Sequence, residues 1–188
     1  MARLPYPDEA NLDDATRTML AALGRPMNIF RMLAHAPATL KGVQVLGSAV
    51  LGRQSLSAKL RELAILRVAQ RSSAAYEWAQ HVPIAHACGV TQDQVEALER
   101  GDAVASCFDG IERSVLAASD ELVTGARLSD RVLGCLQQTL PPAQIVELVV
   151  AIGFYMLVAR FLETTGVELE SEGVPDAGSV DPRLTGRR

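Results

Sequence analysis

Two short stretches of the sequence carry side chains suited to acid–base chemistry. Glu62 stands within 60–69, where most residues are apolar, and Glu77 and His81 stand four residues apart within 74–88. Residues four apart lie on one face of a helix, and the rest of that face is mainly apolar. Carboxyl and imidazole groups in an apolar pocket perturb each other's pKa values. The pattern therefore points to proton transfer near neutral pH.

Simpler interpretations of the same residues stay open at this point. A buried Glu62 needs a partner, and an ion pair with Arg67 or with an arginine from another helix would provide one. A glutamate and a histidine four residues apart, such as Glu77 and His81, also form ordinary surface pairs. All three side chains together would serve as metal ligands, although no further His or Asp stands at ligand spacing.

The elements that must position these residues are helices. Apolar residues recur at helical spacing, no stretch alternates as a strand does, and Gly and Pro punctuate the chain. This pattern predicts an all-α protein with helices at about 12–23, 29–36, 37–51, 56–71, 74–88, 91–100, 110–124, 129–138 and 141–164. Asn28 is expected to cap the helix at 29–36, and Thr91 with Gln94 forms a capping-box pattern for the helix at 91–100. The turn between 56–71 and 74–88 is short, so these two helices should pack antiparallel and bring Glu62 towards Glu77 and His81.

Composition limits the class of protein. The 188 residues, 48% hydrophobic and 21% charged with a net charge of -4, fit one globular domain with apolar surface to bury between subunits. No cluster of Lys and Arg appears, which argues against a nucleic-acid partner. Cys88, Cys107 and Cys135 lack CxxC or zinc spacing. The longest apolar run, 148–159, is too short for a membrane span, so we expect a cytoplasmic protein without membrane contact.

Several of these stretches resemble the carboxymuconolactone decarboxylase family. The resemblance rests on 60–69 and 76–81, followed by 85–90, and it extends to 28–37 and 147–155. It covers about 26–166. It divides the chain into an N-terminal arm and helix (1–25), a helical domain (26–168) and a flexible C-terminal tail (169–188).

The same superfamily contains alkylhydroperoxidase D-like enzymes, whose pattern is a glutamate, a Cys-x-x-Cys pair and then a histidine. Glu62 and His81 match the glutamate and the histidine, but Ala74 and Glu77 stand where the cysteines would be. Without both sulfurs, disulfide chemistry of that kind has no thiols to use. The departure argues against peroxidase or reductase activity.

The resemblance implies an alkylhydroperoxidase D-like helical bundle that assembles as a trimer or a hexamer, with a pocket near subunit interfaces. It also implies pocket-lining or interface positions, which are Asn28, Phe30, Tyr76, Trp78 and Tyr155.

The family reaction implied is decarboxylation of a small lactone or β-keto acid without metal or cofactor. We expect His81 to act as the acid or base, Glu77 to orient it and Glu62 to be a second proton carrier, although these roles are interchangeable. The alternatives are a metal-dependent enzyme that uses the same three residues, a small-molecule-binding protein without catalysis, and a reductase in which Cys88 acts alone.

Overall fold

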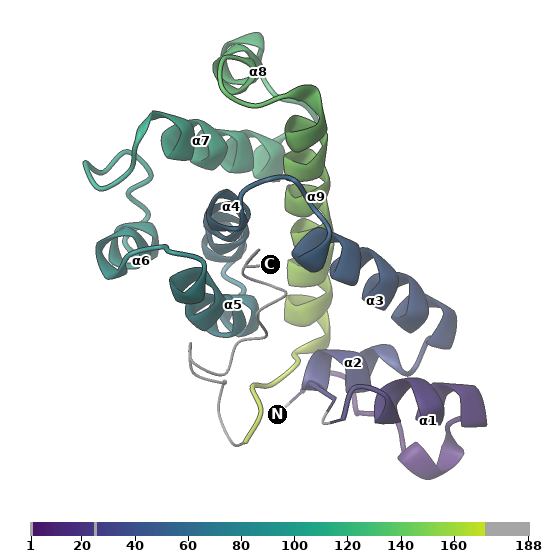
Figure 1. Ribbon diagram of the computed structural model, residues 1–188. Coiled ribbons are helices and arrows are strands. Elements are labelled where there is room, and N and C mark those ends of the chain that lie inside the picture. The colour runs from purple at the N-terminus through teal and green to yellow at the C-terminus, as the bar shows by residue number, and fades with distance from the viewer. Residues whose placement is uncertain (1, 25, 172–188) are drawn as a thin grey trace.

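A computed structural model describes residues 2–24 and 26–171, and all regular structure in these residues is helical. Figure 1 shows the arrangement. The elements in chain order are η1 (Glu9–Asn11), α1 (Asp14–Ala21), α2 (Asn28–Leu33), α3 (Pro37–Gly52), α4 (Ala58–Arg71), α5 (Ala75–Ala87), α6 (Gln92–Glu99), α7 (Gly110–Thr124), α8 (Asp130–Gln137) and α9 (Pro142–Thr165). The expectation of an all-α chain is confirmed for this part of the sequence.

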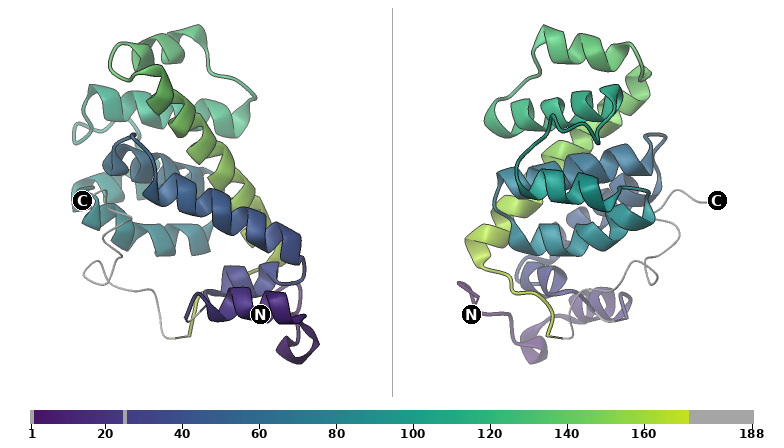
Figure 2. Two further views of the ribbon diagram at one scale, coloured as in Figure 1. Left: turned by 45° about the vertical axis from the view of Figure 1, so that its right-hand side comes forward. Right: turned by 90° about the vertical axis from the view of Figure 1, so that its left-hand side faces the viewer.

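Helix α4 is the centre of the bundle. It packs against α5, α7 and α9, and every residue from Leu60 to Ala69 is buried. Figures 1 and 2 show α4 enclosed by these helices, with α3 lying along α9 on the other side. A helix that is buried on all faces is typical of the interior of a bundle. Any charged residue on α4 must therefore find a partner inside the protein.

Local sequence signals explain most helix boundaries. Thr91 and Gln94 form the expected capping box at the start of α6, and Asp109 and Glu112 form another at the start of α7. Helix α7 spans 110–124 as the sequence predicted, and the other helices differ from prediction mostly by one or two residues at their ends. Helix α5 continues through Pro83.

The start of α2 differs from the prediction. Asn28 was expected to cap this helix, but it is the first helical residue, and Met27 stands at the cap without a side-chain hydrogen bond. The Asn28 side chain instead donates to the carbonyl of Glu168, at 2.9 Å. The asparagine therefore ties α2 to the chain segment after α9.

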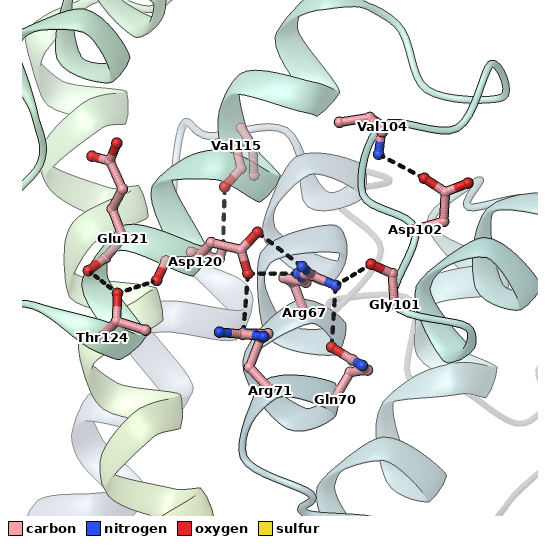
Figure 3. Close-up of polar contacts among 11 residues, drawn as sticks. Arg67, Gln70, Arg71, Gly101, Asp102, Val104, Val115, Asp120, Glu121 and Thr124 are labelled. Carbon is pink, nitrogen blue, oxygen red and sulfur yellow. Dashed lines mark hydrogen bonds and ion pairs between the residues drawn. The ribbon is translucent and has the colours of Figure 1, made fainter.

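A polar cluster centred on Arg67 joins α4 to α7 (Figure 3). Its guanidinium donates twice to the Asp120 carboxylate at 2.8 Å, and its Nη1 donates to Gln70 and to the carbonyl of Gly101. Arg71 also contacts Asp120, at 3.3 Å. Planar, bidentate pairing of this kind is geometrically specific. It fixes how α7 lies on the central helix.

Helix α9 ends at Gly166, which has a left-handed conformation. This residue has φ of +68°, and a Cβ there would lie 2.8 Å from the backbone nitrogen of Arg3. Only glycine accommodates both conditions. The backbone amides of Arg3 and Leu4 donate to the carbonyl of Thr165. The N-terminal arm and the segment after α9 thus pack together, and residues 172–188 of the expected tail lie outside the described residues.

Helix α9 has the length and composition of a membrane span, and it is the one such helix among the described residues. Half of its most apolar window is buried inside the protein. It contacts α3, α4, α5, α7 and α8. This burial is typical of the core helix of a bundle.

Candidate functional site

Glu62 lies at the centre of the protein, on the part of α4 that faces α5. Its side chain is fully buried. Oε1 accepts hydrogen bonds from Nε and Nη2 of Arg61, each at 2.9 Å. Arg61 also donates to the carbonyl of Leu51, at the end of α3. The Arg61 guanidinium therefore compensates the charge of a carboxylate that water does not reach.

His81 on α5 is held by the other oxygen of Glu62. The distance from its Nδ1 to Glu62 Oε2 is 2.8 Å. A carboxylate can only accept, so Nδ1 carries the proton in this contact. Nε2 has no hydrogen-bond partner among the described residues. The edge of the ring also packs against Tyr155, with centroids 4.8 Å apart. The imidazole is thus fixed in one orientation with one nitrogen available.

Glu77, one helical turn before His81, differs from the buried Glu62 in its hydrogen bonding. Its side chain is 2% exposed, and neither carboxyl oxygen has a hydrogen-bond partner in the described structure. Burial raises the pKa of Glu77 well above its ordinary value of 4.5, and the charge of Glu163 raises the pKa further. Desolvation without a partner favours the neutral acid. Glu77 therefore retains its proton to higher pH than an exposed glutamate does.

Both His81 and Glu77 line a cavity of about 400 Å³ between α2, α3, α5 and α9. That volume suits a small organic molecule. Most of the wall is apolar, and its larger apolar side chains are Leu23, Met27, Ile29, Phe30, Val43, Leu51, Ile84, Phe154, Val158 and Leu162. Its polar members are Gln44, Ser48, Tyr76, Glu77, Gln80, His81 and Tyr155.

Tyr155 connects the cavity with the buried Glu62. Its pKa lies well above the ordinary value of 10, first because of burial and then because of the charges of Glu62 and Glu77. The phenol therefore remains neutral. His81 packs against this ring, Glu62 bonds His81, and Glu77 stands one turn before His81 on α5, so the three residues gather beside Tyr155.

The structure brings together the three acid–base residues expected from the sequence, but with different contacts. Glu62, rather than Glu77, bonds the His81 ring, because neither oxygen of Glu77 has a partner. Arg61, rather than Arg67, pairs with Glu62, since Arg67 binds Asp120.

The five expected pocket residues divide into two groups. Phe30, Tyr76 and Tyr155 line the cavity. Asn28 is not in the lining and holds the segment after α9. Trp78 packs away from the cavity, in a small apolar cluster with Ala69, Ala74 and Ala159.

Sequence reasoning missed three residues of the site, which are Arg61, Gln80 and Glu170. Arg61 adjoins Glu62, and side chains of adjacent helical residues do not normally face each other. Gln80 lies four residues after Tyr76 on α5, a spacing that would have placed it in the same wall. Glu170 was assigned to the tail, although its carboxylate bonds both Tyr76 and Gln80.

The side-chain positions do not support the metal alternative. In residues 2–24 and 26–171, no group of three or more His, Cys, Asp and Glu side chains is placed to hold a metal ion. The Glu62 oxygens are already engaged by Arg61 and His81. No cysteine is among the described residues that line the cavity, and Cys88 is the residue that ends α5.

Comparison with solved structures shows the fold. A peroxidase-related protein from Ralstonia eutropha JMP134, described as an alkylhydroperoxidase AhpD core, is 18% identical with a TM-score of 0.79, covering 96% of this chain and 98% of its own. A peroxidase-related protein from Silicibacter sp. TM1040 is 19% identical with a TM-score of 0.77, covering 93% and 94%. A variant of the debrominase Bmp8 in complex with 2,3,4-tribromopyrrole is 15% identical with a TM-score of 0.70, covering 91% and 95%.

Comparison with protein families identifies the sequence class. Among curated proteins, no sequence matches the chain significantly. The model of the carboxymuconolactone decarboxylase family matches residues 37–121, which include α3, α4, α5 and α6 and therefore Glu62, Glu77 and His81. Residues 37–121 therefore match the carboxymuconolactone decarboxylase family, and the fold of the chain is that of the alkylhydroperoxidase D-like structures.

Proposed function

We propose that this protein is a cofactor-free enzyme that decarboxylates a small lactone or β-keto acid by proton transfer in the cavity. The observation that carries the proposal is Glu77, a buried carboxyl group without a partner in the wall of an apolar cavity. An unsatisfied buried polar group is costly and calls for an explanation, which catalysis provides. His81 adds an oriented imidazole with a free Nε2 in the same wall.

The reaction begins with loss of carbon dioxide from the substrate. The bond between the carboxylate and its carbon breaks, and the electron pair moves into the conjugated carbonyl to give an enolate. Apolar walls assist because they disfavour the localised charge of the carboxylate that leaves. The enolate then takes one proton at carbon, and the carbonyl forms again. No oxidant or reductant enters this balance.

Each acid–base residue has a distinct role in the proposal. Glu77, kept neutral by burial, donates a hydrogen bond to the developing enolate oxygen, as protonated acids in apolar sites do elsewhere. His81 delivers the proton to carbon from Nε2 and is recharged from solvent. Glu62 acts through His81: it fixes the ring and stabilises the imidazolium. Glu62 is therefore a positioning residue.

Product labelling tests the proposal directly. Small β-keto acids and carboxylated γ-lactones are incubated with the protein in D₂O, and carbon dioxide release above the uncatalysed rate is followed with NMR of the product. We expect one deuterium on a single face of the carbon that lost the carboxylate. His81→Ala should lower the rate about 10²–10⁴-fold, the usual contribution of general acid–base catalysis. Glu77→Gln should also lower it.

His86→Ala is the matched control, because it removes an imidazole from the same helix. The His86 ring bonds the carbonyl of Val90 and does not line the cavity. This variant should keep both the rate and the single-face labelling. Unchanged turnover in His81→Ala and Glu77→Gln, or product labelled equally on both faces by the unmodified protein, would contradict the proposal.

We also propose that the partner of this chain is a second copy of itself, bound on the outer face of α9. From residue 142 to residue 159, no exposed position is charged. Val146, Val150 and Leu157 are 62%, 40% and 53% exposed, and Val45 on the adjacent α3 is 65% exposed. Continuous apolar surface of this kind marks interfaces. Light scattering should give a mass of at least twice 20.1 kDa, and Val150→Glu with Leu157→Glu should reduce it to the monomer.

A further inference from the structure

The segment after α9 places a carboxylate against the wall of the cavity. Glu170 Oε1 accepts hydrogen bonds from the Tyr76 hydroxyl at 2.7 Å and from the backbone N–H of Asn28 at 2.8 Å. Its Oε2 accepts from the Gln80 amide at 2.6 Å. We call these three donors the cradle. It engages both oxygens of one carboxylate from two directions.

The cradle is part of the cavity rather than a separate surface feature. Tyr76 and Gln80 stand four residues apart on α5, and both line the cavity together with Glu77 and His81. Burial and the bond to Glu170 raise the pKa of Tyr76 far above the ordinary value of 10, so its hydroxyl remains a donor. The wall that carries the acid–base pair thus also carries two fixed donors for an anion.

The donors that hold Glu170 in the cradle are neutral groups. Within the part of the chain that the structure describes, Glu170 forms no ion pair. Its bonds do not depend on features that are unique to a glutamate, because any carboxylate offers the same two acceptor oxygens. The cradle is therefore equally suited to the carboxylate of a small acid.

Few contacts fix the segment that carries Glu170. Val167 is buried. At Glu168, the carbonyl accepts from Asn28, the carboxylate accepts from the backbone N–H of Ala2, and the N–H reaches the Tyr6 hydroxyl at 3.4 Å. Gly166 begins the segment with a left-handed turn. Because this segment has one buried side chain and a partly exposed carboxylate, the free energy needed to detach it locally from the protein is small.

We propose that the cradle of Tyr76, Gln80 and the Asn28 N–H is a carboxylate-binding subsite of the cavity, which Glu170 fills in the free protein and yields to a ligand acid. The inference rests on the proposed function for the identity of the reacting group. Three hydrogen bonds stabilise a carboxylate and would be lost with it, so the carboxylate held here is retained in the reaction. A decarboxylated substrate therefore carries a second acid group, which anchors it.

Calorimetric titration with phenylacetate and its neutral analogue phenylacetamide tests the subsite without any chemistry. Glu170 competes with the ligand, so the apparent Kd exceeds the intrinsic Kd in inverse proportion to the fraction of molecules in which the cradle is open. Glu170→Ala should therefore bind phenylacetate about tenfold more tightly than the unmodified protein. The affinity for phenylacetamide should increase much less. Glu170→Gln, which keeps the shape and weakens the contact, should lie between the two.

Two further variants test whether the change in affinity arises from the cradle or from altered charge and space around it. Glu99→Gln removes one exposed negative charge on α6 and none of the cradle bonds, so phenylacetate affinity should not change. Tyr76→Phe in the Glu170→Ala background should reverse most of the gain for phenylacetate and leave phenylacetamide unaffected. Equal tightening for both ligands in Glu170→Ala, or no effect of Tyr76→Phe, would overturn the subsite.

Hydrogen exchange of the unmodified protein gives a measurement that needs no variant. Saturation with phenylacetate should increase exchange at 167–170, because the ligand replaces Glu170 and releases the segment. Unchanged or slower exchange there would overturn the displacement. Both readouts measure binding alone, so inactive protein that still shows them would contradict only the proposed reaction. Active protein without them would contradict only the subsite.

Discussion

Helix α4 carries two polar clusters that differ in how completely their groups are hydrogen-bonded. The Arg67 cluster, which faces α7, has its guanidinium fully engaged by Asp120, Gln70 and Gly101 (Figure 3). The cluster around Glu62, which faces α5 and α9, is only partly satisfied. Glu62 is engaged on both oxygens, but among the described residues the cavity-facing Glu77 has no hydrogen-bond partner and Nε2 of His81 has none. The two clusters therefore differ in how far their polar groups are satisfied.

The difference lies in what each cluster does with its polar groups. A buried network that satisfies all its members rigidifies the protein, whereas an unpartnered buried group costs stability. Glu77 limits this loss of stability by keeping its proton, since burial raises its pKa. Strained or unsatisfied groups persist where they are useful for function. Variants of the two clusters should thus affect stability with opposite signs.

The largest effect on stability is expected for Arg67→Met. The side chain is 7% exposed, and its loss leaves Asp120 and the carbonyl of Gly101 without their main donor. Removing one partner of a buried pair costs about 3–5 kcal/mol, and the lower end applies because Asp120 is 31% exposed and keeps Arg71. Urea unfolding should show the loss, while turnover of the remaining folded protein stays near normal.

Arg100→Met provides the control for loss of an arginine. Arg100 is 66% exposed and lies 3.9 Å from Glu96, and such substitutions usually change stability by less than about 0.5 kcal/mol. If Arg67→Met were as mild as Arg100→Met, or if it abolished turnover in folded protein, the separation between the two clusters would fail.

Most of the fold followed from local patterns in the sequence. Apolar spacing and end signals such as Thr91 with Gln94 located the helices, because these interactions operate within a few residues. The errors arose where distant segments decide. Asn28 looked like a cap, but the segment after α9 takes its side chain. The contacts of Glu170, which falls within the expected tail, were missed for the same reason, since they reach residues about 90 and 140 positions earlier.

The sequence predicted that Glu62, Glu77 and His81 come together, but it did not predict their contacts. The four-residue spacing of Glu77 and His81 favoured a bond between them. The crossing of α4 over α5 instead brings Glu62 to the imidazole and leaves Glu77 facing the cavity. Side-chain pairing between helices depends on crossing geometry, which one sequence does not specify. The proposed roles of Glu62 and Glu77 are consequently exchanged relative to the sequence-based expectation.

A smaller effect, of opposite sign, is expected for Glu77→Gln. The folded protein holds the Glu77 proton more tightly than the unfolded chain, so stability falls as pH rises above the ordinary pKa of 4.5 towards the raised pKa of the folded state. Glutamine removes this dependence. The variant should therefore match the unmodified protein in stability at about pH 4 and exceed it increasingly at higher pH, although it turns over substrate more slowly.

Glu112→Gln is the matched control, because Glu112 is an equally buried but satisfied carboxylate. It accepts from Gln94 at 2.8 Å and pairs with Lys59 at 2.6 Å. Hydrogen bonds to charged groups contribute about 1.5–3 kcal/mol, so this variant should be less stable at neutral pH. A gain of stability in Glu112→Gln, or a loss of stability in Glu77→Gln, at neutral pH would contradict the contrast between satisfied and unsatisfied carboxyl groups.

The smallest effect is expected for Glu163→Gln, which tests the cause of the raised pKa of Glu77. Glu163 is exposed, and its charge is the second cause after burial. Removing it should lower the pKa of Glu77, so the loss of stability with pH should end at lower pH than in the unmodified protein. Because salt screens exposed charges, the shift should be larger at low ionic strength. It should vanish in the Glu77→Gln background, since no carboxyl remains there to titrate. A shift that persists in that background would show that Glu163 acts on another group, and burial would then be the whole cause at Glu77.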